Sequence, residues 1–397
     1  MLLLAQFIAL CPSYGSLWHL TGIALRMCID LGLHWETDAQ RLSMSPTVLH
    51  ERRRLWYSTY QLDRSMCITL SRPLSIADTS IRVMLPNPWT APLTLQVASA
   101  DLDAYDTHTQ RAHNYVFSMS QLESEIIQVQ QSQTWTIKIA SPRVDFTAWL
   151  QDIEPRLREW YATIPERSKA HPASIFAYEA YWDILYHRVI LLLYRPSSMA
   201  THMSLDNLSI IFESSCKMIS SIRILQRDGK IPVLWEAVYQ LFMAGLGIIY
   251  YLWYLKEIRN RASISAYIST LQSCASTLSA MAETFPAASG CRDAFDTLCS
   301  ATVSWLVAND AEKTQSDRQD FEDQMRDLLQ QLQKSHGAPT LSLDSHINMP
   351  VMLSENFSVG EMLRSAAQWP DLQAADFGGI FFDSMEEERI YGGSGWF

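Results

Sequence analysis

Apolar side chains recur at helical spacing in one segment after another of this chain, and no stretch shows the strict alternation typical of β-strands. Predicted helices cover, in order, residues 16–31, 45–70, 108–131, 144–164, 172–194, 205–226, 233–257, 263–283, 289–307 and 312–334. Only 14 Gly and 16 Pro occur among 397 residues, so little interrupts these segments. The sequence therefore predicts an all-α fold, with one large multi-helix domain over residues 1–335.

The first predicted helix has an apolar strip and a defined end. The strip consists of Leu20, Ala24, Met27 and Leu31, which repeat at helical spacing and are predicted to face the core. Gly32 follows directly, at the position where glycine commonly ends a helix because it adopts a left-handed backbone without strain. The chain is therefore predicted to turn at Gly32.

The second predicted helix begins with Ser45 as N-cap, followed by a proline in the first turn. One strip along it consists of Leu49, Arg53, Trp56, Tyr60, Asp63, Cys67 and Leu70. Two charges, Arg53 and Asp63, thus lie on an apolar face, about 15 Å apart and too far to pair with each other. Each is predicted to pair with another element, and the expected partner of Asp63 is Arg26 or Arg72.

These charges leave two interpretations open. In the first, Arg53, Asp63 and Arg72 form a buried ion network that fixes helix packing, which alone accounts for the pattern because removing one member costs about 3–5 kcal/mol. In the second, the same side chains hold a carboxylate or phosphate of a ligand. No catalytic or cofactor-binding residue is predicted. No metal-binding residue is predicted either, because the seven cysteines include no Cys-x-x-Cys pair of the kind that zinc modules use.

The charge balance argues against a surface that binds nucleic acid. The formal net charge is −11 at pH 7, whereas neutralising phosphates needs clustered Lys and Arg. Two apolar stretches, residues 1–10 and 241–255, are shorter than the roughly 20 residues of a membrane span, and the first lacks the positive start of a signal peptide. Residues 241–255 are predicted to form a buried core helix and residues 1–10 the apolar half of a helix, and no membrane partner is expected.

The C-terminal part has a different composition. Residues 336–368 are turn-rich and weakly patterned, and they are predicted to form a linker. Residues 369–397 mix aromatic and acidic side chains, which is typical of disordered activation segments. The predicted contact residues of this tail are Trp369, Phe377, Phe381 and Phe382. The alternative is that the tail is a helix docked on the core.

Short motifs follow one another in a fixed order between Trp18 and Pro86. They read Trp18-His-Leu-Thr-Gly22-Ile-Ala-Leu-Arg26, Asp30-Leu-Gly32-Leu-His34, Glu51-Arg-Arg53-Arg-Leu-Trp56, Leu62-Asp63-Arg64, Ser71-Arg72-Pro73 and Leu85-Pro86. The series resembles the middle homology region of fungal binuclear zinc-cluster transcription factors, strongly to Pro86 and more faintly to Pro196. Its signature residues here are Trp18, Gly22, Arg26, Gly32, His34, Arg53, Trp56, Asp63, Arg72 and Pro73. Two positions depart from the family pattern: Ser71 replaces the common glycine, and Tyr57 replaces the second of two tryptophans.

The resemblance implies a nuclear transcriptional regulator of a biosynthetic gene cluster or metabolic pathway, with no enzymatic activity. Family members usually carry a six-cysteine zinc module near the N-terminus, whereas this chain begins within the regulatory region, so we expect no sequence-specific DNA binding by the chain alone. The implied partners are a coactivator for the tail, a DNA-binding protein or a second copy, and a small-molecule effector. The alternatives are an all-α small-molecule-binding or enzymatic protein derived from this fold, and a truncated, non-functional regulator.

Overall fold

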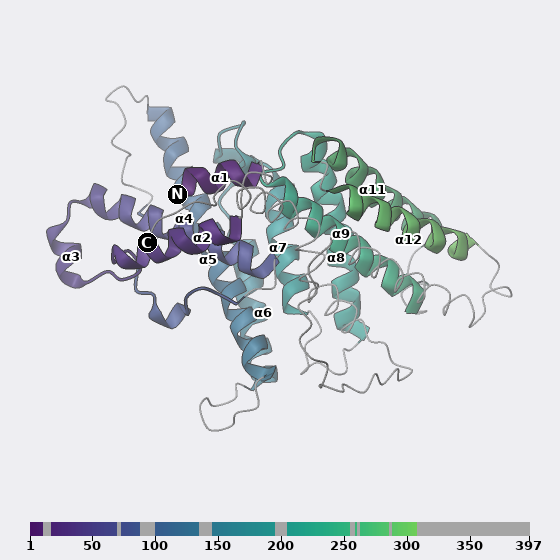
Figure 1. Cartoon of the computed structure of the whole chain (residues 1–397), viewed down its shortest axis with the longest axis horizontal. Helices are drawn as coiled ribbons and strands as arrows, with labels where there is room; N and C mark the ends of the chain where they lie inside the picture. The colour runs from purple at the N-terminus through teal and green to yellow at the C-terminus, as the bar shows by residue number, and fades with distance from the viewer. Residues whose placement is uncertain are drawn as a thin grey trace, which may run out of the picture. The chain divides into compact units, whose positions relative to one another are not determined.

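The computed structural model describes most of the first 307 residues. The described ranges are 1–10, 17–69, 73–87, 100–134, 145–194, 205–254, 259, 263–285 and 288–307. Within them the chain forms 11 α-helices and no β-strand (Figure 1). This confirms the predicted all-α fold. The predicted helix over 312–334, the linker and the tail lie outside the described residues.

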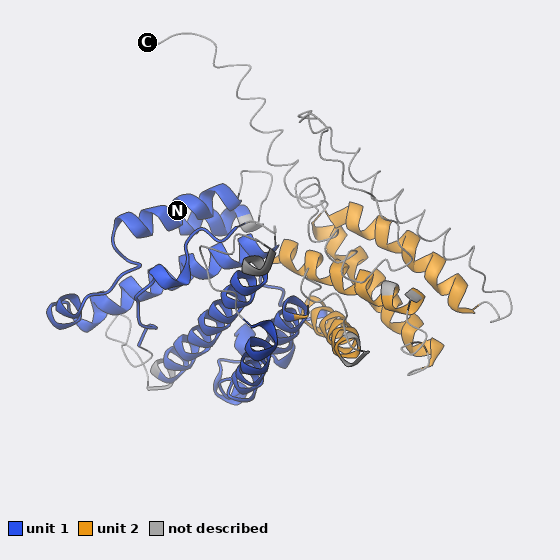
Figure 2. Cartoon of the chain, turned by 90° about the horizontal axis from the view of Figure 1, so that it is seen from below, with its two compact units in different colours: residues 1–11, 16–193, 227–232 blue, residues 12–15, 194–226, 233–397 orange. Residues whose placement is uncertain are grey.

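The chain divides into two compact units (Figure 2). Unit 1 comprises residues 1–11, 16–193 and 227–232, and unit 2 comprises residues 12–15, 194–226 and 233–397. The sequence pattern gave no sign of this division, because helical periodicity continues on both sides of it. The predicted boundaries at residues 335 and 368 stay predictions.

Unit 1 contains seven α-helices in its described part. They are α1 (Leu2–Leu10), α2 (Leu17–Asp30), α3 (Asp38–Ser43), α4 (Pro46–Thr69), α5 (Ala100–Thr134), α6 (Phe146–Ala162) and α7 (Glu179–Leu193). Helix α4 packs against α2 on one side and α5 on another, and α5 also contacts α6 and α7. Three short 3-10 helices complete the unit: η2 (Asp78–Ser80), η3 (Arg167–Lys169) and η4 (Ile175–Ala177).

The predicted ends of α2 and α4 are confirmed. Gly32 has φ +66° just after α2, a left-handed conformation that glycine adopts without strain. The Val48 backbone N–H donates to Ser45 Oγ at 3.4 Å, so the Ser45 side chain caps the first turn of α4. These two local signals position α2 and α4 on either side of the α3 connection.

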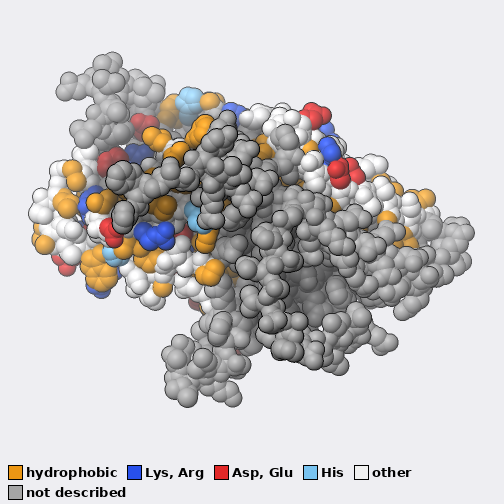
Figure 3. All heavy atoms as spheres, in the orientation of Figure 1, with side chains coloured by type: hydrophobic (Ala, Val, Ile, Leu, Met, Phe, Trp, Pro, Cys, Tyr) orange, Lys and Arg blue, Asp and Glu red, His pale blue; other side chains and the backbone are white. Residues whose placement is uncertain are grey.

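The predicted buried strip of α2 is partly wrong. The buried residues are Leu17, Thr21, Ala24, Leu25 and Cys28, whereas Met27 and Leu31 are 48% and 63% exposed. The buried side of α2, which contacts α4, is thus turned about the helix axis relative to the predicted strip. It includes Thr21, a polar residue that is not counted in the strip because the strip is defined by apolar positions. Figure 3 shows hydrophobic side chains at the surface on the left of the view, where α2 and α3 lie.

Unit 2 is built on α8 (Leu205–Arg227), α9 (Leu234–Tyr254), α11 (Ile264–Thr284) and α12 (Ser289–Val307). Helices α9, α11 and α12 each contact the other two. Helix α9 supplies many of the fully buried side chains of the unit, among them Leu241, Ile248, Ile249 and Leu252. The apolar run around residue 245 is therefore a core helix, as predicted. No helix in the described part of the chain is both long and apolar enough to cross a membrane.

Two glycines of α9 are expected to respond in opposite ways to alanine. A Cβ at Gly245 would lie 2.4 Å from a Phe295 ring carbon and 2.7 Å from Cys274 Sγ, whereas one at Gly247 would meet Ser215 Oγ at 3.6 Å and a Tyr251 ring carbon at 3.9 Å, both ordinary contacts. Gly245→Ala is expected to destabilise unit 2 by about 1–2 kcal/mol, because overpacking outweighs the gain in helix propensity. Gly247→Ala is expected to be neutral or to stabilise by up to about 1 kcal/mol. Thermal unfolding of both variants checks this prediction, and equal melting temperatures would contradict it.

Candidate functional site

Residues 73–87, here called the strap segment, belong to unit 1 and follow α4 in sequence. The segment pairs with residues 34–36 through two backbone hydrogen bonds, Arg82 N–H to His34 O at 2.9 Å and Glu36 N–H to Arg82 O at 2.8 Å. The Tyr57 hydroxyl of α4 donates to Val83 O at 2.7 Å. Each of these bonds pairs a backbone N–H or C=O group that lies outside the helices and would otherwise lack a partner within secondary structure. The strap segment is thereby fastened to the end of α2 and to α4.

A buried arginine joins the strap segment to α4 and α5. The Arg64 side chain is fully buried, and its guanidinium donates to Asp63 Oδ2 at 2.7 Å, to Ser124 Oγ at 3.1 Å and to Ile76 O at 2.6 Å. It also contacts Asp78 Oδ1 at 3.3 Å. A buried guanidinium needs most of its N–H groups bonded, and this one reaches four partners.

Asp78 of η2 is the second centre of this network. Its carboxylate accepts from the Tyr60 hydroxyl at 2.7 Å, from Gln128 Nε2 at 2.9 Å and from the Ser124 hydroxyl. With Arg64 included, both oxygens of Asp78 are fully used. Asp78 therefore ties the strap segment to α4 and α5 at a single point.

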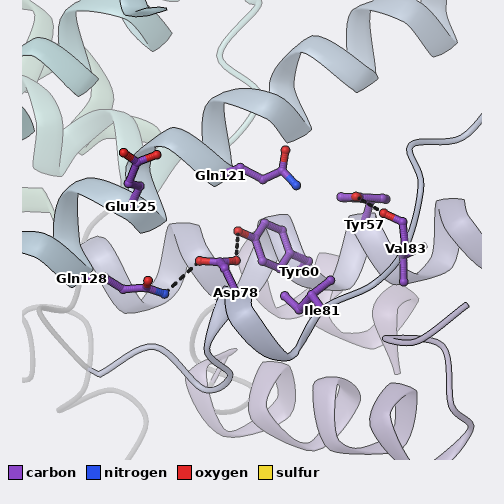
Figure 4. A pocket seen from close by; sticks show the side chains of 8 residues that line it. All are labelled: Tyr57, Tyr60, Asp78, Ile81, Val83, Gln121, Glu125 and Gln128. Carbon is purple, nitrogen blue, oxygen red and sulfur yellow. Dashed lines mark hydrogen bonds between the residues drawn. The ribbon is translucent and has the colours of Figure 1, made fainter. Parts of the chain in front are cut away.

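Between the strap segment, α4 and α5 lies a cavity of about 280 Å³, here called the strap cavity (Figure 4). Its lining consists of Tyr57, Tyr60, Asp78, Ile81, Val83, Gln121, Glu125 and Gln128. Burial raises the pKa of Tyr57 to about 12 and raises that of Tyr60 as well. Both phenols are thus protonated at neutral pH and act as hydrogen-bond donors.

A second cavity of about 380 Å³ adjoins the first on α5. It shares Gln121 and Glu125 with the strap cavity. Its other lining residues belong to α5 and α6, together with Thr163, which directly follows α6. The Glu125 carboxylate accepts from both terminal nitrogens of Arg156, at 2.9 and 2.8 Å, and from Trp149 Nε1 at 2.9 Å. Burial opposes ionisation of Glu125, but these bonds and the Arg156 charge hold its pKa below the ordinary value.

The prediction that Arg53 pairs outside its own helix is confirmed. Arg53 donates to both oxygens of Glu36, at 2.8 and 2.5 Å, and both side chains are buried. Arg41 donates to the same carboxylate at 2.9 Å. Glu36 also pairs with the strap segment through its backbone N–H, and its ion pair with Arg53 links the α2–α3 connection to α4.

Of the two partners predicted for Asp63, Arg26 is wrong, and Arg72 is not tested by the described residues. Asp63 pairs with Arg64, its neighbour on α4, and accepts from Ser75 Oγ at 2.5 Å. Arg26 instead has its guanidinium nitrogens 3.7 and 3.8 Å from the position of a Gly22 Cβ, on α2. Arg72 lies outside the described residues. The interpretation of a buried ion network therefore describes Arg53 and Asp63, with different partners.

The remaining signature residues are scattered over unit 1. Trp56 is fully buried and lies 6.1 Å, ring to ring, from His34. Trp18 contacts His19 edge-on, with 4.9 Å between ring centres, and is exposed. Pro73 is exposed at the start of the strap segment. None of the nine signature residues in the described part is among the residues that line the strap cavity.

Sequence reasoning missed the residues that line the cavity. One signal was available: Tyr57 departs from the family pattern, and its hydroxyl reaches the strap segment at Val83. Tyr60 lies on the predicted strip of α4, and the other lining residues come from the strap segment and α5, where no sequence motif marked them. No group of three or more His, Cys, Asp or Glu side chains in the described part could hold a metal ion.

In comparisons with known proteins, the matching family and the similar proteins are transcription factors and regulators from fungi. Residues 1–162 match the family described as fungal specific transcription factor domain. The chain is 25% identical to the positive regulator of purine utilization of Emericella nidulans, over 77% of this chain and 35% of that protein. It is 24% identical to pyrimidine pathway regulatory protein 1 of Saccharomyces cerevisiae, over 65% and 29%, and 25% identical to the acetamidase regulatory protein of Aspergillus fumigatus, over 56% and 27%.

The chain thus spans about a third of the length of these relatives. No solved structure matches it significantly. The relatives are named as regulators and none as an enzyme, which argues against the enzymatic alternative. The matched region ends at residue 162, the last residue of α6, and includes the strap segment and every lining residue of the strap cavity. Residues 1–162 of this chain belong to the fungal specific transcription factor domain family.

Proposed function

We propose that the chain is the regulatory part of a transcriptional regulator that acts in the nucleus on genes of a metabolic pathway or biosynthetic gene cluster. The family match over residues 1–162 carries this proposal. Relatives named for purine utilization, the pyrimidine pathway and acetamidase support a metabolic role. The helical units would serve as a scaffold that responds to a small-molecule effector or protein partner.

The acidic and aromatic tail, residues 369–397, is proposed to contact a coactivator or the transcription machinery. Its aromatic residues are too few to form a core, and the interspersed acids keep them in water and available to a groove on the partner. Fused to an unrelated DNA-binding domain, the tail is expected to activate a reporter in a fungal host. Replacing Phe377, Phe381 and Phe382 together with alanine is expected to abolish the signal.

The matched control is Glu387→Ala, which removes one acid from a run of three and is expected to leave the reporter signal nearly unchanged. A silent fusion, or a triple variant as active as the parent, would contradict the activation segment. The alternative of a tail docked on the core would then account for its aromatic residues.

The chain alone is expected not to bind DNA sequence-specifically. Its formal net charge of −11 opposes the phosphate backbone, and its cysteines lack the close spacing of a zinc module. A DNA-binding partner protein or a second copy is the proposed companion. In a gel-shift assay at physiological salt, the purified chain should leave duplex DNA unshifted. Sequence-specific binding at submicromolar concentration would refute this prediction.

A further inference from the structure

The strap cavity has the size and the walls of a site for a small flat molecule. The phenol rings of Tyr57 and Tyr60, with Ile81 and Val83, provide its apolar surface. Figure 4 shows Gln121 of α5 near the two tyrosines, and Gln128 of the same helix bonded to Asp78. Its volume of about 280 Å³ is at the lower end of the roughly 300–1,000 Å³ of ligand pockets, which suits a single ring and excludes a large cofactor.

Two lining side chains have acceptor atoms that the protein does not fully use. Gln128 bonds through Nε2 to Asp78, and in the described part of the chain its Oε1 has no partner. Glu125 Oε2 accepts one bond, from Arg156, whereas a carboxylate oxygen can accept about two. A ligand with N–H groups would satisfy both atoms without breaking an existing bond.

No basic side chain is among the eight described residues that line the cavity. Arg64 lies behind the Tyr60 ring, 4.2 Å from its centre, and its N–H groups are engaged in the buried network. Arg156 is bonded to Glu125 and to Asp152. An anionic ligand would therefore face carboxylates at close range with no free cation to offset them.

We propose that the strap cavity binds a small planar molecule that donates N–H hydrogen bonds, either neutral or cationic, and that it rejects carboxylates and phosphates. An amide, an amidine or a nitrogen heterocycle with N–H groups has this chemistry. The inference depends on the proposed function in one respect: if the chain is a regulator, such a molecule is its effector. Binding itself is measured on the purified chain and stands or falls separately.

Three probes share one ring and differ only in the group that tests the proposal: benzamidine, benzamide and benzoate. Titration of the full chain by calorimetry or ligand-observed NMR is expected to rank benzamidine first, benzamide second and benzoate last. The difference between the extremes should be about tenfold or more, the effect of one favourable charge contact at partial exposure. Benzoate binding as tightly as benzamidine, or no benzamidine binding at millimolar concentration, would overturn the proposal.

A variant pair assigns the binding to this cavity. Gln121 is exposed and lines the cavity, where its side chain also bonds the Tyr57 side chain, and Gln121→Lys introduces a cation at this site. It is expected to weaken benzamidine binding about tenfold or more. Gln151→Lys makes the same change at an exposed position of α6 outside the lining and should bind as the parent does. Equal weakening in both, or in neither, would refute the assignment. A silent reporter fusion with intact benzamidine binding would count against the proposed function alone.

Discussion

Replacing Arg64 with methionine is expected to lower the free energy of unfolding of unit 1 by about 3–5 kcal/mol, the cost of breaking a buried ion pair. Methionine fills a similar volume but cannot donate a hydrogen bond. The variant would leave Asp63 and Asp78 without their cation, and Ile76 O and Ser124 without a donor. Because Asp63 and Ser124 are buried, water cannot replace their bonds to Arg64.

Arg54→Met is the matched control, since it changes the same residue type on the same helix. Arg54 pairs with Glu51 at 3.1 Å, and both side chains are about half exposed. Such surface pairs contribute about 0–1 kcal/mol, so little change is expected. Urea unfolding followed by tryptophan fluorescence measures both variants, and amide exchange of α4 assigns the loss to unit 1. An Arg64 variant as stable as the Arg54 variant would show that the network contributes nothing.

The helices could be predicted because apolar residues recur at helical spacing within each one, and because some of their ends are marked by the residue type found there. Ser45 and Gly32 mark ends through their own backbone chemistry, and the structure confirms both. The phase of a buried strip is less secure, because it depends on which side meets a neighbouring helix. On α2 that side includes Thr21, so Met27 and Leu31 fall outside it.

The polar contacts of unit 1 could not be predicted in the same way. The strip pattern showed that Arg53 and Asp63 need partners, but a partner is chosen by tertiary distance. Glu36 stands 17 residues before Arg53 in a turn. Neighbouring residues on a helix point about 100° apart, so a bond between them is not expected from the helical pattern. Arg64 nevertheless bonds Asp63, because its side chain is long.

The strap cavity shows the same limit. Its lining comes from three segments between positions 57 and 128, and although Gln121, Glu125 and Gln128 repeat at helical spacing on α5, no motif joins the three segments. Tyr57 alone stood out, as a departure from the family pattern. Since a tryptophan there could not offer a hydroxyl to Val83 O, this substitution is part of how the chain builds its own version of the cavity.

Glu36→Gln is expected to destabilise unit 1 by roughly 2–4 kcal/mol. Removing one member of a buried pair costs about 3–5 kcal/mol, and the amide oxygen of glutamine still accepts one hydrogen bond from Arg53. Glu51→Gln is the control, because Glu51 pairs with Arg54 at an exposed position of α4. Its expected effect is within about 0.5 kcal/mol. Thermal unfolding at pH 7 compares the two variants with the parent chain.

The cost of Glu36→Gln is also expected to depend on pH. Burial opposes ionisation of Glu36, but the hydrogen bonds and charges of Arg53 and Arg41 outweigh it, so the pKa lies below its ordinary value. A carboxyl whose pKa is lowered by folding stabilises the protein above its unfolded pKa, about 4.3, and loses this contribution as the pH falls through the folded pKa. The gap in melting temperature between parent and Glu36→Gln should therefore be constant from pH 7 to about 5 and shrink below about 4. A gap that stays constant down to pH 3 would contradict the expected loss of the Glu36 charge in this range, because glutamine has the shape of glutamate and differs from it in charge and hydrogen bonding.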